Sequence, residues 1–447
     1  MIMRKLLLLT LCLVQSLVLQ ALDYQVVNTV VSTAYTSYYV NYTSVGADAK
    51  TPTTLSGVVT VPNLTTLANF DVLVLDSHHT VCDDASAPSS LGSTMAGSLA
   101  LGGLYPMVCP DYLGYGFTKD QVHPFLCQEL LARQSLDLVA VAIDLLADEK
   151  IGIHPHMLGN IGYSQGGGVA MGVHKLYEND ADYASLADIF TLGIHTVCGG
   201  GPYDPYTTGL DFYAKAERVT FPALLPLLVN GFLSGADDEL KAGAKFDDFF
   251  QERLLVPSTI IDPATGNPEE YPGLETLVAS KLYGNDKAST MMVVANQGKW
   301  GLADFFSADM MDTESDLYRN FFAWLSANSV CRGWTPKSDI TLYHLIEDDV
   351  VTSENTVLAI SELNIPEACQ HLVPGCTVGI EGDNRHSQFA AVFFASAVKE
   401  IATAYATGLD VIENISSVAP AYDLMGRQVG AGYQGVQIRN GKKTVVR

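Results

Sequence analysis

The chain has 447 residues, of which 25 are lysine or arginine and 49 are aspartate or glutamate, so its formal net charge is −24 at neutral pH. A surface this acidic repels the phosphates of nucleic acids and of anionic membranes, which argues against either as a main partner. The length is sufficient to bury a large hydrophobic core, either in one domain with insertions or in as many as about three domains.

Residues 1–21 have the pattern of a secretory signal peptide. Basic residues precede an apolar run over residues 6–14, and Ala21 ends a short stretch suited to signal-peptidase cleavage. A membrane anchor is the competing interpretation, but the apolar run is short for a bilayer span and Gln15 begins a polar interruption. The pattern predicts an exported protein without a stable membrane span, located outside the cell, at its surface or in the periplasm.

Export places the cysteines in an oxidising compartment. The sequence has eight, and removal of Cys12 with the signal peptide leaves seven, an odd number in which at least one is unpaired. Cys369 with Cys376 is the first candidate for a local disulfide and Cys109 with Cys127 is a second, while the connectivity otherwise stays open. The sequence has no C-x-x-C pair and no H-E-x-x-H motif, so we expect no zinc site.

The first strands are expected soon after the signal peptide. Residues 24–42 are rich in valine, threonine and tyrosine, and residues 57–61 follow turn-like sequence, which predicts an antiparallel start to a sheet. A compact apolar run over residues 70–75 then leads into a polar loop that contains His79 and Thr80. This loop either supplies a backbone N–H to a catalytic oxyanion hole or is a plain surface loop.

The strongest chemical motif is Gly-Tyr-Ser-Gln-Gly at residues 162–166. It lies between an apolar run of strand length and a helical pattern, so its serine is expected on a sharp strand-to-helix turn that projects the hydroxyl beyond the sheet. We therefore identify Ser164 as the candidate nucleophile. Gln165 begins the helix, where its backbone N–H can stabilise an oxyanion. The alternative is a glycine-rich turn with only a structural role.

The strand pattern stops at residue 205 and returns at about residue 333. Helical segments are expected between these points, at residues 221–232, 237–255 and 317–327. The segment is a candidate helical cap over an active site, and the alternative is simple packing of these helices against the sheet. The leucines and phenylalanines of residues 221–232 suit an acyl pocket or a hydrophobic core equally well.

The sheet pattern resumes at residues 340–346, which lead into Asp348 and Asp349. A short strand is expected at residues 377–380, followed by a polar loop, His386 and an apolar helix over residues 389–401. Only two histidines follow the acidic pair. His371 is expected to precede the strand, so His386 is the candidate base, and the chain order of serine, aspartate and histidine is that of α/β hydrolases.

Several motifs together resemble a known family. PDYLGYG at residues 110–116, HPF at 123–125, a helix around 135–137, GYSQGG at 162–167 and GPYD at 201–204 are similar to the secretory lipases and related bacterial esterases of the α/β-hydrolase superfamily. The resemblance extends over roughly residues 42–402. It implies an α/β-hydrolase fold, a mostly parallel central sheet flanked by helices, with a helical cap insertion.

The resemblance also selects the acid of the triad. Members of the superfamily that resemble this chain carry an acidic residue followed by a variable residue and two valines, which matches Asp348, with Asp349 as the second choice. Ser164, Asp348 and His386 then predict an exported esterase or lipase that cleaves a small-molecule ester or lipid through an acyl-enzyme and requires no cofactor. A serine peptidase and a non-catalytic surface binding protein of the same fold are the alternatives.

The end of the chain differs in composition from the rest. From residue 420 onward it has five basic residues against one acidic residue, and residues 413–447 resemble a shortened C-terminal sorting domain of the type nine secretion system, a candidate contact for export machinery. The alternative is a strand pair that completes the core. The predicted organisation is a signal peptide (1–21), two parts of a hydrolase core (22–204 and 333–412), a cap (205–332) and this tail.

Overall fold

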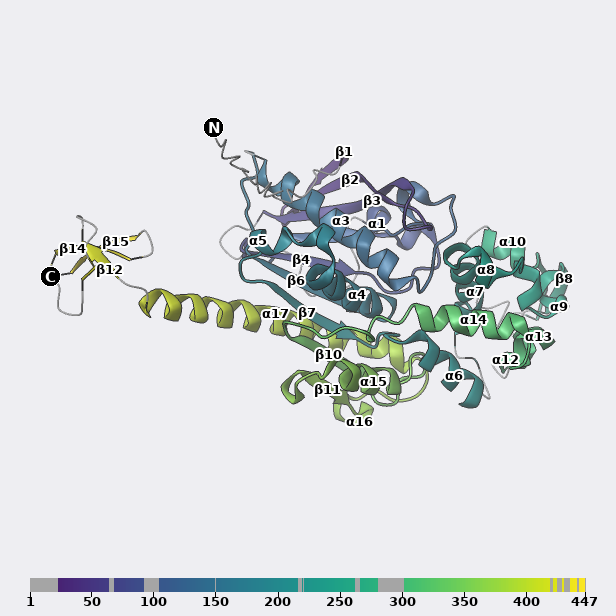
Figure 1. The fold of residues 1–447 in the computed structure, drawn as a ribbon. Helices are drawn as coiled ribbons and strands as arrows, with labels where there is room; N and C mark the ends of the chain where they lie inside the picture. The colour runs from purple at the N-terminus through teal and green to yellow at the C-terminus, as the bar shows by residue number, and fades with distance from the viewer. Residues whose placement is uncertain are drawn as a thin grey trace, which may run out of the picture.

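A nine-stranded sheet runs through the centre of the molecule, and helices cover both of its faces (Figure 1). The computed structural model describes residues 23–63, 68–91, 104–148, 150–215, 219, 221–261, 266–279, 301–418, 421–423, 428–429, 435–439 and 442–446. The predicted signal peptide lies outside these residues. The order of the strands in the central sheet is β1-β2-β3-β5-β4-β6-β7-β10-β11.

The sheet begins with antiparallel strands, as the sequence predicts. These are β1 (Tyr24–Val31), β2 (Tyr35–Val45) and β3 (Pro52–Pro62), and β3 pairs antiparallel with β5 (Met107–Pro110). Their many β-branched and aromatic residues favour the extended backbone. Every residue of β1 is exposed, because this strand forms the open edge of the sheet.

The remaining strands are parallel to β5 and to one another. They are β4 (Val72–Ser77), β6 (Met157–Tyr163), β7 (Ile194–Gly199), β10 (Ile340–Leu345) and β11 (Gln370–Val373). Strands β4, β6 and β10 are buried at every position, which explains their largely apolar sequence. Because the strands are parallel, the residues that follow their carboxyl ends meet at one edge of the sheet.

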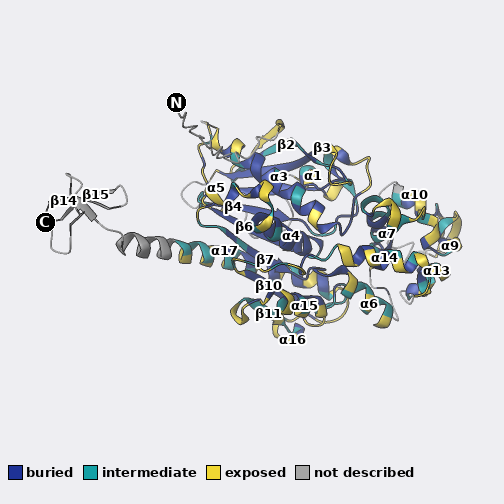
Figure 2. Cartoon of the chain, viewed as in Figure 1, coloured by how far each residue is buried: buried dark blue, intermediate teal, exposed yellow. Residues whose placement is uncertain are grey.

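Helices on the two faces bury alternate residues of the strands. On one face α3 (Gln128–Ala147) and α4 (Gln165–Asn179) pack in a cluster with Leu73 and Leu75 of β4. On the other face the first part of α17 (Arg385–Val418) packs in a cluster with Val72 and Val74. The central strands are consequently the most buried part of the fold (Figure 2).

Shorter elements complete the core. They are η1 (Asp84–Ser86), α1 (Pro88–Leu91), η2 (Gly116–Thr118), η3 (Ala181–Tyr183), α5 (Leu186–Ile189), α15 (Glu354–Leu363), η5 (Glu367–Cys369) and α16 (Gly375–Val378). Helix α15 packs on the same face as α4, in a cluster that includes Leu342 of β10 and Ala359.

The segment between β7 and β10 is mainly helical. Its Phe232 and Trp324 belong to a hydrophobic cluster that extends to Phe125 and Leu130 of the core. Its helices are α6 (Pro205–Lys215), α7 (Leu224–Gly235), α8 (Asp238–Lys241), η4 (Phe246–Phe249), α9 (Glu252–Leu255), α10 (Leu274–Ala279), α12 (Leu302–Phe305), α13 (Ala308–Met311) and α14 (Asp316–Ala327). This segment projects from the carboxyl edge of the sheet (Figure 1).

Two expectations for this segment are wrong. The predicted helical stretch at residues 237–255 is broken into three short helices, because Ala242 and Gly243 adopt positive φ and end the first of them. The segment also contains a hairpin of β8 (Ser258–Ile261) and β9 (Pro268–Tyr271), where only helices were expected.

The strand predicted at residues 377–380 is also wrong. Residues Gly375–Val378 form the short helix α16, which Pro374 precedes and Gly379 ends with a positive φ. The strand is β11, seven residues earlier, and it pairs with β10. His371 therefore lies within the strand, with its ring stacked on Tyr343 at a centroid distance of 4.2 Å. A short apolar run fits either a strand or a helix, and only pairing decides between them.

Neither predicted disulfide is present, since all seven cysteines of the described residues are free. Cys109 belongs to the cluster beneath α17, whereas Cys127 belongs to the cluster of the helical segment, so the two thiols lie in different cores. Cys376 is exposed on α16, and Cys369 is partly buried against the cluster around α15.

Helix α17 and the tail differ from the rest of the chain. Residues 385–408 of α17 are long and apolar enough, by length and composition, to span a membrane, but Phe389, Phe393 and Ile401 are buried against the central sheet. Beyond this helix, β12 (Ala421–Asp423), β13 (Gln428–Val429), β14 (Gly435–Arg439) and β15 (Lys442–Val446) form a separate four-stranded sheet. The described strands of the tail therefore add none to the core.

Candidate active site

Ser164 occupies a sharp turn between β6 and α4. Its backbone has φ 58° and ψ −124°, a combination that residues with a side chain rarely adopt. The Ser164 N–H donates to Gly199 O at 2.8 Å, which ties the turn to the end of β7. The turn therefore holds the serine hydroxyl at the carboxyl edge of the sheet.

The two glycines of the motif make this turn sterically feasible. A Cβ atom on Gly162 would lie 2.0 Å from Gly166 O, and one on Gly166 would lie 1.9 Å from Ser77 O. Both distances are far shorter than van der Waals contact, so neither position tolerates a side chain without a backbone shift. This is the physical reason for the glycines that flank the serine in the sequence.

Asp348 and His386 come from different elements and meet in a short hydrogen bond. Asp348 follows β10, and His386 lies in the first turn of α17. His386 Nδ1 and Asp348 Oδ2 are 2.6 Å apart, and their side chains are 8% and 0% exposed. The other ring nitrogen of His386, Nε2, is buried without a hydrogen-bond partner in the part of the chain that the structure describes.

Several groups hold the Asp348 carboxylate in its ionised form. Its Oδ1 accepts from the N–H groups of Val350 at 2.9 Å and Val351 at 2.8 Å. Burial by itself raises the pKa of Asp348, but the charge of His386 and the hydrogen bonds to the carboxylate outweigh it and hold this pKa below its usual value. The carboxylate is therefore an acceptor at neutral pH.

A second histidine, His344, also faces Asp348. Its Nε2 lies 2.9 Å from Val351 O and 3.5 Å from Asp348 Oδ2, and its Nδ1 lies 2.5 Å from Thr356 Oγ1. Because a carbonyl oxygen can only accept, Nε2 carries the proton. Burial lowers the pKa of His344, which keeps the imidazole neutral. The His344 Nε2–H therefore donates to Val351 O and lies beside the Asp348 carboxylate.

The backbone of His386 is fixed as well. Its N–H donates to Asp349 Oδ1 at 3.0 Å, and its carbonyl accepts from the Tyr163 hydroxyl at 2.6 Å. The Tyr163 ring stacks on the imidazole with a centroid distance of 5.0 Å. Burial raises the pKa of Tyr163 well above its usual value, so its hydroxyl stays protonated and continues to donate.

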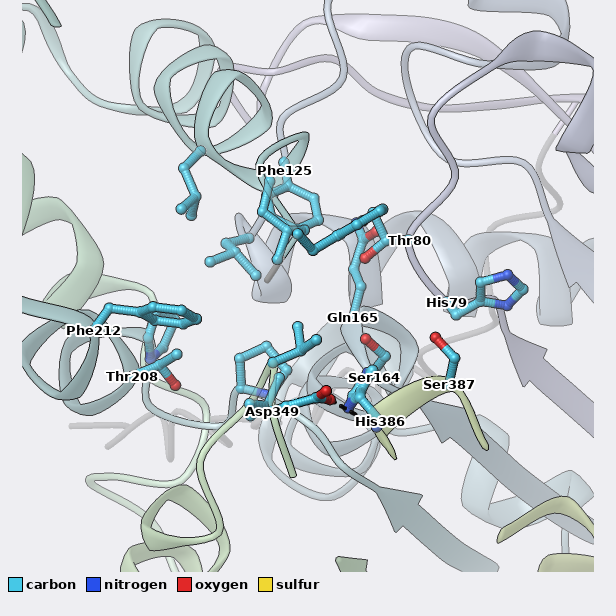
Figure 3. Close-up of a pocket in the computed structure, with 18 of the residues that line it drawn as sticks. His79, Thr80, Phe125, Ser164, Gln165, Thr208, Phe212, Asp349, His386 and Ser387 are labelled. Atoms are coloured by element: carbon cyan, nitrogen blue, oxygen red, sulfur yellow. Dashed lines mark hydrogen bonds between the residues drawn. The ribbon is translucent and has the colours of Figure 1, made fainter. Parts of the chain in front are cut away.

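The predicted oxyanion residues border the same space as the serine. Gln165 is the first residue of α4, and its side-chain amide contacts His123 Nε2 at 2.8 Å. His79 and Thr80 follow β4 and line the cavity beside Ser164 (Figure 3). Burial, with the nearby histidines, lowers the pKa of His79 to about 4, so this imidazole is uncharged at neutral pH.

Ser164 and His386 open into a large cavity of about 890 Å³. Most of its wall is apolar and comes from the segment between β7 and β10 and from α17. The lining residues from these two parts include Phe212, Phe221, Leu224, Leu228, Phe306, Phe321, Phe322, Leu325, Ala390, Ala391, Phe394 and Val398. The arrangement combines one reactive hydroxyl with a space for a large apolar group.

The structure places all six predicted site residues at the carboxyl edge of the parallel strands. Five of them line the cavity, and Asp348 lies behind His386, away from the cavity. Tyr163 and His344 were not anticipated. Tyr163 occupies a variable position of the serine motif, and His344 lies on a strand four residues before the acid, so neither carries a sequence signal of its own.

Comparisons of the sequence with known proteins return no relative. No family model matches the chain, and no curated protein matches it.

Solved structures are similar in fold. An esterase from Xanthomonas oryzae, LipA, that degrades rice cell walls matches with a TM-score of 0.63 at 18% identity, over 83% of this chain and 92% of its own. A Legionella pneumophila protein classed as a hydrolase gives 0.61 at 18% identity, over 84% and 91%. Lipase A of Candida antarctica in its closed state gives 0.51 at 14% identity, over 83% and 82%.

Proposed function

We propose that this chain, which has the α/β-hydrolase fold, is a carboxylic-ester hydrolase that acts through an acyl-enzyme on Ser164. The observation that supports this most is the buried 2.6 Å pair of His386 Nδ1 and Asp348 Oδ2, which leaves the opposite nitrogen of the imidazole free beside a serine on a strained turn. A free imidazole nitrogen near a hydroxyl is what a general base requires.

The mechanism follows from these positions. His386 Nε2 takes the hydroxyl proton of Ser164 as its oxygen attacks the ester carbonyl, and Asp348 stabilises the imidazolium that forms. The Gln165 N–H, at the start of α4, and a backbone N–H of His79 or Thr80 stabilise the oxyanion. The imidazolium then protonates the leaving alcohol, and His386 activates a water that hydrolyses the acyl-enzyme.

The cavity indicates the kind of ester. A wall of phenylalanine and leucine side chains fits an apolar acyl group and offers few partners for the backbone amides of a peptide. An apolar acyl ester is therefore the proposed substrate. We propose the helical segment over residues 205–332 as the cap, since it supplies much of this wall.

Replacement of the nucleophile tests the proposal. Ser164→Ala should lower the turnover of p-nitrophenyl esters by about 10³-fold or more and abolish labelling by an organophosphonate. The melting temperature should stay close to that of the parent. Ser396→Ala, which removes a hydroxyl from α17 outside the cavity lining, is the matched control and should keep both activity and labelling. Labelling that persists in Ser164→Ala would rule out Ser164 as the nucleophile.

A substrate panel separates ester hydrolysis from the other functions that this fold supports. Rates should be high for p-nitrophenyl esters and negligible for peptide nitroanilides. Faster cleavage of the nitroanilides would indicate a peptidase, and the absence of both reactions, with no phosphonate labelling, would indicate a binding protein.

We also propose that the protein is exported, on the basis of the signal pattern at residues 1–21. Amino-terminal sequencing of the protein recovered outside the cytoplasm should begin after Ala21. The tail over residues 413–447 is the proposed sorting segment, and its deletion should leave the hydrolase inside the outer membrane without loss of esterase activity.

A further inference from the structure

We infer that Asp349 is a positioning residue that anchors His386 through the start of α17 and adds a second negative charge beside the base. This inference rests on the proposed function, because it assigns a role within the same site. It separates the two neighbouring aspartates: Asp348 binds the imidazole, whereas Asp349 binds the backbone that carries it.

Two hydrogen bonds support the anchoring role. Asp349 Oδ1 accepts from the His386 N–H at 3.0 Å, and Asp349 Oδ2 accepts from the Arg385 N–H at 3.3 Å. These are the first two N–H groups of a 34-residue helix, and such groups have no partner within the helix itself. The carboxylate therefore acts as an amino-terminal cap supplied by a residue 36 positions earlier in the chain.

The cap controls the position of the imidazole because the base lies in the first helical turn. Tyr163 holds the His386 carbonyl and stacks on its ring, Asp348 holds Nδ1, and Asp349 holds the backbone N–H. Without it, the first turn is free to fray. An error of about 1 Å in the position of a catalytic group can reduce turnover about 10²-fold.

Charge gives the same residue a second effect. The amino-terminal end of α17 carries a partial positive charge, which disfavours an imidazolium in the first turn, and the Asp349 carboxylate offsets it. The other titratable or charged groups around His386 are Asp348, the Tyr163 hydroxyl, the neutral His79 and His344, and Arg385 on the same helix. Asp349 is therefore the only carboxylate besides Asp348 that contacts His386 in the described chain.

Two substitutions separate anchoring from charge. Asp349→Asn keeps an oxygen that accepts the backbone N–H but removes the charge, whereas Asp349→Ala removes both. We expect Asp349→Ala to lower kcat on a p-nitrophenyl ester about 10- to 100-fold with KM within about twofold of the parent. Asp349→Asn should restore most of this loss. Any turnover that Asp349→Asn fails to restore measures the effect of the charge alone.

A measurement without substrate keeps this inference distinct from the proposed function. The hydrogen bond from His386 Nδ1 to Asp348 should give a downfield proton NMR signal that His386→Ala lacks. We expect this signal to persist in Asp349→Asn and to broaden or vanish in Asp349→Ala. That pattern of NMR signals would support the anchoring role even if the protein hydrolyses no ester. A lack of ester hydrolysis would count against the proposed function alone.

Three results would overturn the inference. The first is an Asp349→Ala variant that keeps the parent's NMR signal and a kcat within twofold. The second is an increase in KM with unchanged kcat, which would indicate that Asp349 contacts the substrate. The third is loss of turnover in Asp349→Asn with normal turnover in Asp348→Asn, which would make Asp349 the acid of the triad.

Discussion

Glu178, in the last turn of α4, shows how a single carboxylate joins two elements of the core. It accepts from the Lys337 N–H at 2.7 Å and from the Ser338 N–H and hydroxyl at 2.9 and 2.6 Å, and His174 Nε2 lies 3.2 Å away. Burial alone would raise its pKa, but these contacts outweigh burial and lower the pKa of Glu178 to about 2. The side chain is 5% exposed, so solvent screens these contacts little.

This pKa predicts an acid-sensitive contribution to stability. The pKa of Glu178 in the folded protein lies below the pKa of about 4.3 for an unfolded glutamate. Its contribution to the free energy of unfolding is therefore complete above about pH 4.3 and is lost as the pH falls toward 2. Glu178→Gln should lower the free energy of unfolding at neutral pH, and the difference from the parent should shrink as pH approaches 2. Urea unfolding at several pH values measures this.

Glu129→Gln is the control for this experiment. Glu129 pairs with Lys175 on the surface, where an ion pair contributes little to stability. Its curve of unfolding free energy against pH should follow that of the parent. If the free energies of unfolding of Glu178→Gln and the parent differed by a constant amount from pH 7 to pH 2, the lowered pKa of Glu178 would be contradicted.

At the scale of elements, the two ends of the helical segment are joined to each other. Arg332, the last residue of the segment, donates to Asp204, which directly precedes the segment, through Nε and Nη2, both at 3.2 Å. The Val330 N–H also donates to Tyr203 O at 2.9 Å. The Asp204 side chain is 1% exposed, so its charge depends on these partners. These contacts therefore hold the two ends of the helical segment together where it leaves the sheet.

Removal of the cation should weaken these contacts. Arg332→Ala leaves a buried carboxylate with fewer donors, and we expect it to cost about 1–3 kcal/mol, less than a fully buried pair because the arginine is 46% exposed. Arg319→Ala, which removes an exposed pair with Asp316, is the control and should change the free energy by less than about 0.5 kcal/mol. Equal losses of unfolding free energy in the two variants would show that the buried Asp204 carboxylate is not stabilised by Arg332.

At the scale of the whole molecule, the cavity reaches solvent without any movement of the helical segment. Asn384 and Ser387 line the cavity and are exposed, so they mark its mouth beside α17. Because Arg332 and Asp204 join the two ends of the helical segment, the segment is restricted from opening as a rigid body. For the proposed esterase, we therefore expect that the substrate enters without a lipid surface.

We therefore expect smooth saturation of the rate with ester concentration, below the solubility limit of the ester. Emulsified triglyceride should not raise the activity toward a soluble ester. The measurement is the initial rate across the solubility limit, with and without emulsion. A steep rise at that limit would instead show that the segment opens at an interface, where lipid covers its apolar residues.

The fold was predictable because its signals are local. The valine-, threonine- and tyrosine-rich strands at the start, the buried strands β4 and β10, and the serine between a strand and a helix all follow from periodicity and turn chemistry within about ten residues. The structure confirms these elements and the α/β-hydrolase fold. The six candidate site residues were chosen from the same motifs and their order, and their catalytic roles stay predictions.

Tertiary structure alone decided what depends on distant partners. Asp348 and Asp349 are adjacent and chemically identical, and only the approach of α17 gives one the imidazole and the other the backbone N–H. Pairing with β10 placed β11 around His371, where the local sequence predicted no strand. Packing in separate cores kept Cys109 and Cys127 unpaired. Each result depends on contacts between segments far apart in the chain, whose geometry no local pattern encodes.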